Sequence, residues 1–197
     1  MTPGTAAAPT PASVLQLALE RPPTLGQGRL VCLDGPAGSG KTTWAAGVAD
    51  LAPGTTVIHM DDLYPGWSGL SQVDAQLDDL LLPLADGRAG SYRRFDWVAG
   101  EFAEEVVVEP TPLLVLEGVG CGASRFASLV TVLVWIEAPH DLRMERGLAR
   151  DGDAFAPYWE QWVKDEVDVF ARERTRDRAD VIVDGAMPYP AVDSSSR

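Results

Sequence analysis

Five short apolar segments recur along the 197-residue chain and show little alternation between hydrophobic and polar positions. Each is rich in Val, Leu and Ile, which is the composition of strands covered on both faces in a parallel sheet. We therefore predict buried parallel strands at Arg29–Asp34, Thr55–His59, Pro112–Glu117, Thr131–Glu137 and Asp180–Asp184.

Longer stretches of helix-like composition separate these strands. They lie at Thr42–Leu51, Ser71–Leu84, Pro139–Arg150 and Ala156–Arg176, and a further helix, Ser13–Glu20, precedes the first strand. Strands that alternate with helices in this way predict a doubly wound α/β fold. Glu104–Val108 is expected to form a short edge strand.

The length and the end segments indicate one domain, which we place at residues 13–187. Residues 1–12 are rich in Thr, Pro and Ala, and residues 188–197 end in a run of serines, so both are predicted to be flexible tails. The N-terminal segment lacks the pattern of a secretory signal, and no apolar run is long enough to span a bilayer. We therefore expect a cytoplasmic protein.

The balance of charged residues limits the classes of partner that the protein is expected to bind. Sixteen basic and twenty-nine acidic side chains give a net charge of −13, which argues against nucleic acid and anionic membranes. Cys32 and Cys121 have no metal-ligand spacing, and His59 and His140 are far apart in sequence, so we expect no cluster of these residues around a metal. The sequence is compatible with a homo-oligomer.

Residues 35–42 read Gly-Pro-Ala-Gly-Ser-Gly-Lys-Thr, a complete GxxxxGK[ST] phosphate-binding loop (Walker A motif) between a predicted strand and a predicted helix. The glycines let successive backbone N–H groups point into one concavity at the positive end of the helix. Lys41 would neutralise the β- and γ-phosphates, and the Thr42 hydroxyl is placed to bind Mg2+. The motif predicts binding of ATP or GTP with Mg2+ through Gly35, Pro36, Ala37, Gly38, Ser39, Gly40, Lys41, Thr42 and Thr43.

Three carboxylates are expected near this loop, because ligands of α/β sheets bind beyond the carboxyl ends of the strands. Asp61 and Asp62 follow the second predicted strand, and Glu117 ends the third. Phosphoryl transfer to a hydroxyl needs one carboxylate as a base and others around Mg2+. We predict Asp61 or Asp62 as the base, Asp62 as an acceptor contact, and Asp61 and Glu117 in the magnesium shell.

Arg143, Arg146 and Arg150 are spaced to share one face of the helix that follows the fourth predicted strand. Such a stripe is often a solvated, ion-paired surface, but here it could close over the triphosphate and neutralise charge in the transition state. We predict that these arginines act in catalysis as a lid.

Aromatic and basic residues gather in the string Tyr92-Arg93-Arg94-Phe95-Asp96-Trp97, which we place in a loop. The aromatics could cover an edge of the core or contact the acceptor. We include Tyr92, Arg93, Phe95, Asp96 and Trp97 among the candidate substrate-binding residues. Tyr64-Pro65-Gly66-Trp67 carries the same two interpretations, whereas Trp159 and Trp162 are expected to pack a helix.

Together these residues resemble the uridine kinase and phosphoribulokinase group of P-loop kinases, from about Leu30 to Asp184. The resemblance rests on the Gly35–Thr42 loop, Asp61-Asp62-Leu63-Tyr64, Leu116-Glu117-Gly118, the Arg143/Arg146/Arg150-Asp151 run and Arg178–Val183. It implies a P-loop NTPase fold of the nucleoside and nucleotide kinase type, with a five-stranded parallel sheet core and helices on both faces. It also implies that Asp61 is the base, that Thr42 and Glu117 bind magnesium, and that Tyr64 and Phe95–Trp97 line the acceptor pocket.

Two stretches depart from the group. Uridine kinases carry an Asp-His-Pro element that holds the sugar, where this chain has Gly69–Asp74, and a histidine after the aromatic string, where this chain has Gly100-Glu101. The residues of phosphoryl transfer are therefore present, while those that would identify the acceptor differ.

The sequence thus predicts an ATP- and Mg2+-dependent kinase that phosphorylates a hydroxyl of a nucleoside or nucleoside-like small molecule. An alternative acceptor is a nucleoside monophosphate, for which Arg93 and Arg94 could supply cations, or an antibiotic hydroxyl. A third hypothesis is a regulatory NTPase module whose hydrolysis drives a switch.

Overall fold

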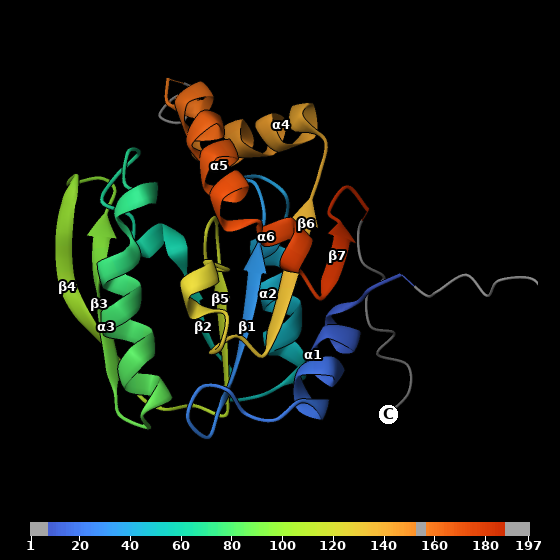
Figure 1. The fold of residues 1–197 in the computed structure, drawn as a ribbon. Coiled ribbons are helices and arrows are strands. Elements are labelled where there is room, and N and C mark those ends of the chain that lie inside the picture. The colour runs from blue at the N-terminus through green and yellow to red at the C-terminus, as the bar shows by residue number, and fades with distance from the viewer. Residues whose placement is uncertain (1–7, 153–156, 188–197) are drawn as a thin grey trace, which may run out of the picture.

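The computed structural model describes residues 8–152 and 157–187 (Figure 1). It contains a five-stranded, wholly parallel sheet in the order β2-β5-β1-β6-β7. Its strands are β1 (Arg29–Asp34), β2 (Thr56–His59), β5 (Leu113–Glu117), β6 (Val132–Glu137) and β7 (Val181–Asp184). All five agree with the predicted strands to within one residue at each end.

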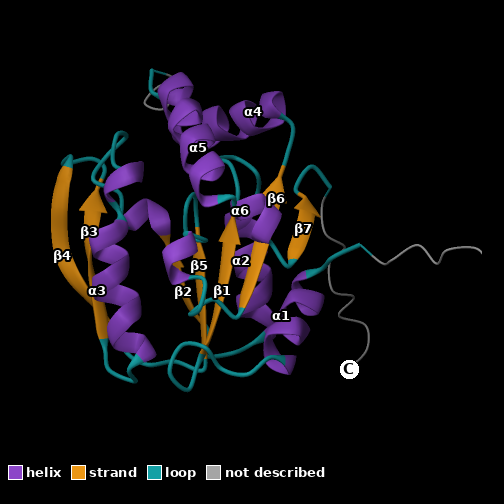
Figure 2. Ribbon diagram, in the orientation of Figure 1, coloured by secondary structure: helices purple, strands orange, loops and turns teal. Residues whose placement is uncertain are grey.

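Helices cover both faces of this sheet, which confirms the predicted fold class (Figure 2). The described helices of eight or more residues are α1 (Pro11–Glu20), α2 (Lys41–Leu51), α3 (Asp74–Ala85), α4 (His140–Asp151) and α5 (Trp159–Glu173). The first begins two residues earlier than expected, because Thr10 and Ser13 form a reciprocal capping box and Pro11 suits the first turn. Residues 1–7 and 188–197, where we predicted most of the two tails, lie outside the described residues.

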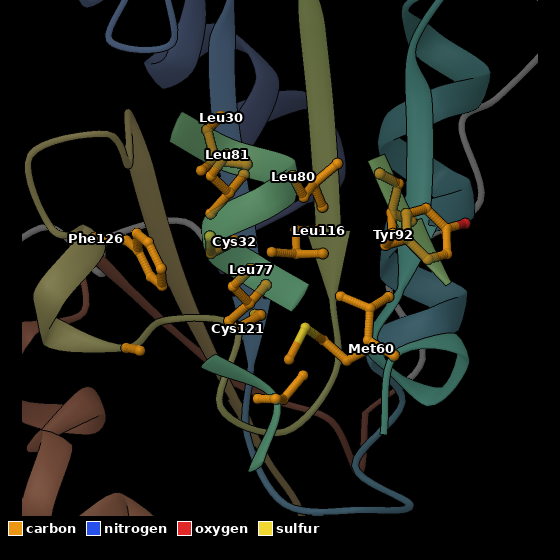
Figure 3. Packing of buried hydrophobic residues seen from close by; sticks show 14 of the residues in the cluster. Leu30, Cys32, Met60, Leu77, Leu80, Leu81, Tyr92, Leu116, Cys121 and Phe126 are labelled. Atoms are coloured by element: carbon orange, nitrogen blue, oxygen red, sulfur yellow. The ribbon is translucent and has the colours of Figure 1, made fainter. Parts of the chain in front are cut away.

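Alternate side chains of each central strand enter different cores. Leu30 and Cys32 of β1 face a cluster with α3 and α5, whereas Val31 and Leu33 face a cluster with α1 and α2. Figure 3 shows the first cluster, where leucines of α3 pack against the sheet. The apolar runs of the sequence are therefore continuous because both faces of each strand are buried.

The aromatic and basic string, apart from Trp97 in the turn that follows it, is a strand and not the predicted loop. It belongs to β3 (Gly90–Asp96), which pairs antiparallel with β4 (Glu101–Val108) in a separate two-stranded sheet beside α3. The predicted edge strand is thus the second half of β4 and does not join the main sheet. A register shift between Arg93 and Phe95 breaks the period of two, so the buried residues Tyr92 and Phe95 lie three positions apart and conceal the strand pattern.

The last predicted helix is also divided. Its described part is α5 followed by the short α6 (Thr175–Arg178), because Arg174 between them adopts a left-handed conformation with φ 49°. The described residues also form short 3-10 turns at Met60–Asp62, Leu70–Gln72 and Ser124–Phe126. Among the described residues, no helix has the length and apolarity needed to cross a bilayer.

Candidate active site

A cleft of about 430 Å3 lies at the carboxyl ends of the parallel strands. Its walls come from the phosphate loop and α2, the turn after β2, the end of β5, α4 and the turn after β7. The lining residues are Ala37, Gly38, Gly40, Lys41, Thr42, Thr43, Trp44, Asp61, Glu117, Gly118, Arg146, Gly147, Arg150, Gly185, Ala186 and Met187. The fold therefore gathers at this edge residues that are up to 150 positions apart in the sequence (37 to 187).

The phosphate loop requires glycine at positions where its backbone comes close to the backbone of neighbouring elements. A Cβ on Gly35 would lie 2.0 Å from the carbonyl oxygen of Ile136 in β6. Gly38 has φ +76°, and a Cβ there would lie 2.4 Å from the carbonyl oxygen of Arg143 in α4. Side chains are excluded at both positions, so the loop can present backbone amides to a polyphosphate.

The side chain of Lys41 is buried and lies over its own loop. Its ammonium donates to the carbonyl oxygens of Gly35 and Pro36 at 2.8 and 2.9 Å. The charge is therefore held at the floor of the cleft, where phosphate oxygens could replace the two carbonyls.

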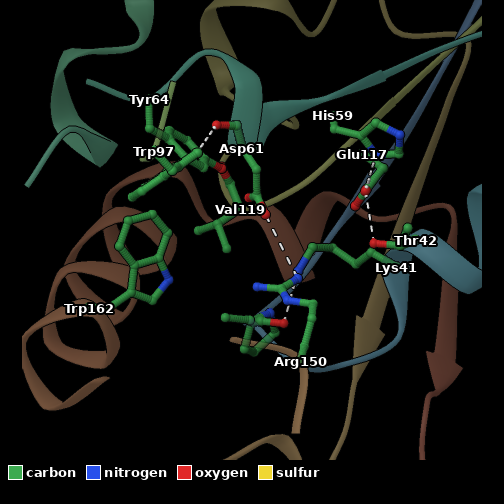
Figure 4. A network of polar contacts seen from close by, with 12 residues as sticks. Lys41, Thr42, His59, Asp61, Tyr64, Trp97, Glu117, Val119, Arg150 and Trp162 are labelled. Atoms are coloured by element: carbon green, nitrogen blue, oxygen red, sulfur yellow. Dashed lines mark hydrogen bonds and ion pairs between the residues drawn. The ribbon is translucent and has the colours of Figure 1, made fainter. Parts of the chain in front are cut away.

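Thr42, Glu117 and His59 form a chain of polar contacts beside the loop (Figure 4). The Thr42 hydroxyl donates to Glu117 Oε1 at 2.9 Å, and His59 Nδ1 lies 2.6 Å from the same oxygen. Burial alone would raise the pKa of Glu117, but the His59 contact, the Lys41 charge and the Thr42 hydroxyl together hold it below its ordinary value. The same contact with Glu117 raises the pKa of His59. Glu117 is therefore kept ionised next to a hydroxyl.

Asp61 lies in the 3-10 turn after β2 and faces the cleft. Its carboxylate is 57% exposed and lies 3.8 Å from the Arg150 guanidinium, and its carbonyl accepts a hydrogen bond from Trp97 Nε1 at 2.8 Å (Figure 4). Asp62 is half-buried and does not line the cleft, and burial raises its pKa. The geometry thus favours Asp61 over Asp62 as the carboxylate that meets a ligand.

The three predicted lid arginines do not share one environment. Arg146 and Arg150 line the cleft, and Arg146 donates to the carbonyl oxygens of Gly38 and Gly185 at 3.3 and 3.0 Å. Arg143 is buried behind the phosphate loop and does not face the cleft, which corrects its predicted place in the lid. Arg143 lies in the first turn of α4, where its guanidinium contacts the Ala37 carbonyl and Glu166 of α5 instead of the cleft.

A buried charge pair that the sequence did not reveal joins this arginine to the phosphate loop. Glu166 of α5 accepts from the Ala37 N–H at 2.6 Å and from Trp162 Nε1 at 2.9 Å, while Arg143 donates to the Ala37 carbonyl at 3.1 Å. The two charges lie 3.5 Å apart. The only signal in the sequence was a glutamate at helical spacing from Trp159 and Trp162, on the face of α5 that turns out to be buried.

Asp34 is a second buried carboxylate that sequence reasoning missed. It ends β1, is fully buried, and accepts the N–H groups of Gly35, Gly120 and Gly122 at 2.7, 2.9 and 2.9 Å. It thereby ties the phosphate loop to the loop after β5. An aspartate at the end of a buried apolar run was the available signal.

Several predicted acceptor contacts serve the fold instead. Tyr64 is fully buried and donates to the Val119 carbonyl, and Tyr92 packs in the core. Asp96 accepts the N–H groups of Val98 and Ala99 and so closes the hairpin turn, which lowers its pKa. None of these three side chains lines the cleft.

Two other predicted contacts, Phe95 and Trp97, line a shallow groove of about 760 Å3 next to Asp61. Aromatic residues that the sequence left undecided or did not single out line it with them. The full set is Pro65, Gly66, Trp67, Ser68, Phe95, Trp97, Gly100, Glu101, Phe102, Tyr158 and Gln161. The β3–β4 hairpin, residues 65–68 and the start of α5 with Tyr158 before it thus supply an aromatic surface, called the aromatic groove below.

The arginines of the string do not line the aromatic groove. Arg93 donates to the carbonyl oxygens of Phe102 and Ala103, and Arg94 pairs with Glu104 at 2.7 Å. These contacts occupy both guanidinium groups along the hairpin.

The cleft fits a nucleoside triphosphate with a magnesium ion. The loop has the glycine-dependent shape of a phosphate cradle, and Thr42 and Glu117 present adjacent oxygen donors. Within the described part of the chain no three His, Cys, Asp or Glu side chains gather as a metal cluster. Magnesium suits this arrangement because it binds through one or two protein oxygens and completes its shell with phosphate and water.

Comparisons with known proteins identify sequences and structures that are similar to this chain. A model of the phosphoribulokinase / uridine kinase family matches residues 72–185. The chain is 24% identical over 176 residues to the uridine kinases of Borrelia turicatae (strain 91E135) and Borrelia hermsii (strain HS1 / DAH), covering 79% of this chain and 85% of each relative. The phosphate loop and Asp61 precede the range matched by the family model, so their assignment rests on their own geometry.

Solved structures show the same fold. A protein from Bacillus stearothermophilus described as a possible uridine kinase superposes with a TM-score of 0.65 at 20% identity. The superposition covers 88% of this chain and 97% of that one. The five-stranded sheet and its helices are therefore shared along almost the whole of that protein.

Proposed function

Because the chain belongs to the phosphoribulokinase / uridine kinase family of kinases, we propose that it is an ATP- and Mg2+-dependent kinase acting on a hydroxyl of a nucleoside or nucleoside-like small molecule. One observation supports this most strongly. Asp61, the phosphate loop and two arginines of α4 line a single cleft that adjoins the aromatic groove. A phosphoryl donor and an acceptor bound in these two hollows would meet at Asp61.

The roles of the residues follow from where they lie. The phosphate loop and Lys41 hold the triphosphate, and Thr42 and Glu117 would hold the magnesium ion, with Asp61 beside them. When bound, the ion neutralises charge on the β- and γ-phosphate oxygens. Arg146 and Arg150 are placed to stabilise charge on the transferred group.

The reaction moves one proton and one phosphoryl group. The acceptor oxygen bonds to the γ-phosphorus as the bond from that phosphorus to the β–γ bridging oxygen breaks. Asp61 accepts the hydroxyl proton, and ADP leaves with the electron pair of the broken bond. The exposed carboxylate of Asp61 leaves room for a hydroxyl to approach.

The experiment that tests this role compares Asp61→Asn with Asp62→Asn. We expect Asp61→Asn to keep its affinity for a nonhydrolysable ATP analogue and to lose about 100-fold or more in turnover, the usual contribution of a general base. Asp62→Asn is the matched control and should change turnover only slightly. The measurements are calorimetry and ADP release; unaltered turnover in Asp61→Asn would remove it as the base.

The acceptor class is tested by ADP release across nucleosides, nucleoside monophosphates and hydroxylated antibiotics. A monophosphate is disfavoured because the charged side chain among the described groove residues is the acidic Glu101, and Arg93 and Arg94 are held by other groups. A regulatory NTPase would instead show slow hydrolysis that no small hydroxyl compound stimulates. We place the reaction in the cytoplasm.

A further inference from the structure

Five aromatic side chains line the aromatic groove and contact one another. Trp67 stacks on Tyr158 with ring centroids 5.1 Å apart and an interplanar angle of 6°, and its other contacts include the edge of Trp97 at 4.9 Å. Phe95 meets both Trp97 and Phe102 edge to face at 5.3 and 5.4 Å. These rings fix one another in place, so the groove has aromatic walls that are set before a ligand arrives.

Part of this aromatic surface is open to solvent. Trp97 is 37% exposed and Tyr158 is 46% exposed. Keeping large rings at the surface costs hydrophobic free energy, so their exposure points to a ligand that covers them.

The charge of the groove is one-sided. Glu101, at the start of β4, is the only charged side chain among the described residues that line it, and Asp61 adjoins it through the Trp97 contact. Arg93 lies over Phe102 with its charge directed to backbone carbonyls, and Arg94 is paired with Glu104. The charged side chain that lines the groove is therefore acidic, and the whole chain is acidic too, with a net charge of −13.

We infer that the acceptor of this kinase is a cationic alcohol, with a quaternary ammonium or flat pyridinium-type group held against Trp67, Trp97 and Tyr158 and a hydroxyl that reaches Asp61. Aromatic faces attract such cations through the ring quadrupole, and a carboxylate at the rim adds a long-range attraction. A neutral alcohol of the same shape gains only the hydrophobic contact. This inference rests on the proposed kinase activity and replaces the nucleoside-like acceptor of that proposal with a cationic alcohol.

Trp97 connects recognition to chemistry. Its ring lines the groove, and its indole N–H donates to the carbonyl of Asp61 at 2.8 Å. A ligand seated on this ring thus lies next to the residue that carries the proposed base, which is the placement that phosphoryl transfer requires.

Pairs of alcohols that differ in charge alone test the inference. Choline is compared with 3,3-dimethylbutan-1-ol, and 1-methyl-3-(hydroxymethyl)pyridinium with 3-methylbenzyl alcohol, by calorimetry without nucleotide and by ADP release with MgATP. We expect at least one cation to bind about three- to thirtyfold more tightly than its neutral partner, the range of cation–π attraction at exposed to desolvated sites. Equal or tighter binding of both neutral alcohols, or no binding of either cation, would overturn the inference.

Variants locate the effect in the groove. Trp67→Leu and Glu101→Gln should each reduce the preference for the cation, whereas Trp67→Phe should retain most of it because a π-face remains. Glu109→Gln, an exposed carboxylate outside the groove, is the control and should leave the preference unchanged. Preference that survives in Trp67→Leu and Glu101→Gln would place cation binding elsewhere and contradict the inference.

The failures of the two proposals are distinguishable. A chain that binds MgATP and releases ADP with neutral nucleosides but ignores the cations keeps the proposed function and loses this inference. A chain that binds no magnesium nucleotide loses the proposed function, whatever the alcohols do.

Discussion

Asp34 lies between the two glycine-rich loops that form the floor of the active site. Its two carboxylate oxygens accept three backbone N–H groups, from Gly35, Gly120 and Gly122. Complete burial raises its pKa to about 6, although these amides and Lys41 act in the opposite direction. One side chain thus ties the end of β1 to the loop after β5, and its protonation is coupled to folding.

We predict that Asp34→Asn destabilises the protein most at acid pH. At pH 5 the carboxyl is largely protonated, and the asparagine NH2 group either meets the Gly122 N–H or displaces another donor, at a cost of about 1–3 kcal/mol. Because the folded pKa lies above the ordinary value of 3.8, the stability linked to protonation is complete below pH 3.8 and is lost as pH rises through 6. The advantage of the native residue should therefore shrink by roughly 1 kcal/mol between pH 5 and pH 8.

Urea unfolding at pH 5 and pH 8 measures this difference. Asp50→Asn, which alters an exposed aspartate of α2, is the control and should show neither the loss of stability nor its dependence on pH. An Asp34→Asn variant as stable as the native chain at pH 5 would mean that the three amides do not need the second oxygen of the carboxyl group.

Helix α5 acts on the site from behind the phosphate loop. Its buried Glu166 accepts the N–H of Ala37 and Arg143 of α4 donates to the carbonyl of Ala37, so two helices fix one residue of the loop through the peptide units on both sides of it. The same helix face carries Trp162, which donates to Glu166 and contacts Trp67 of the aromatic groove at a centroid distance of 6.0 Å. The element thereby contacts the walls of both hollows.

We predict that Glu166→Leu costs about 3–5 kcal/mol of stability, because it leaves the Arg143 charge buried without its partner. The double variant Arg143→Met/Glu166→Leu should recover most of this stability, since an apolar pair of similar size often replaces a buried ion pair without loss. The affinity of the double variant for a nonhydrolysable ATP analogue should remain below that of the native chain, because the N–H and the carbonyl of Ala37 have lost their hydrogen-bond partners. Urea unfolding and calorimetry separate the two effects; recovery of both in the double variant would show that the pair serves packing alone.

At the level of elements, the strands with regular hydrophobic patterns could be predicted from the sequence, whereas the elements with a local irregularity could not. The main-sheet strands were predictable because burial on both faces leaves continuous apolar runs such as Leu30–Leu33. The β3–β4 hairpin was not, because its bulge places Tyr92 and Phe95 out of period, and the end of α5 was not, because Arg174 takes a conformation that glycine or asparagine usually marks. Walker A residues were predictable since the loop is contiguous, whereas Glu166 acts across 129 positions of sequence.

The whole molecule combines an acidic surface with a cleft that concentrates its cations. The net charge is −13, yet three basic side chains, Lys41, Arg146 and Arg150, line the cleft against two acidic ones, Asp61 and Glu117. An anionic ligand is therefore attracted at this edge and repelled by the average field elsewhere. The overall charge was evident in the sequence, but its separation into an acidic body and a basic cleft follows only from the fold, which also takes Arg143 out of the cleft.

We predict that a nonhydrolysable ATP analogue with Mg2+ raises the melting temperature by about 5–10 °C at 100 times its dissociation constant. Ligand binding at that ratio stabilises the folded state by about 2.7 kcal/mol, and a domain of this size gains about 2–4 °C for each kcal/mol. Removal of Mg2+ with EDTA should lower the shift, because Glu117 then faces the phosphates without an intervening cation. Lys41→Ala should abolish most of the shift while Lys164→Ala, which removes the charge of a lysine on α5 that lies outside the cleft, should not. A melting temperature that responds to neither nucleotide nor Mg2+ in the native chain would contradict triphosphate binding at the phosphate loop.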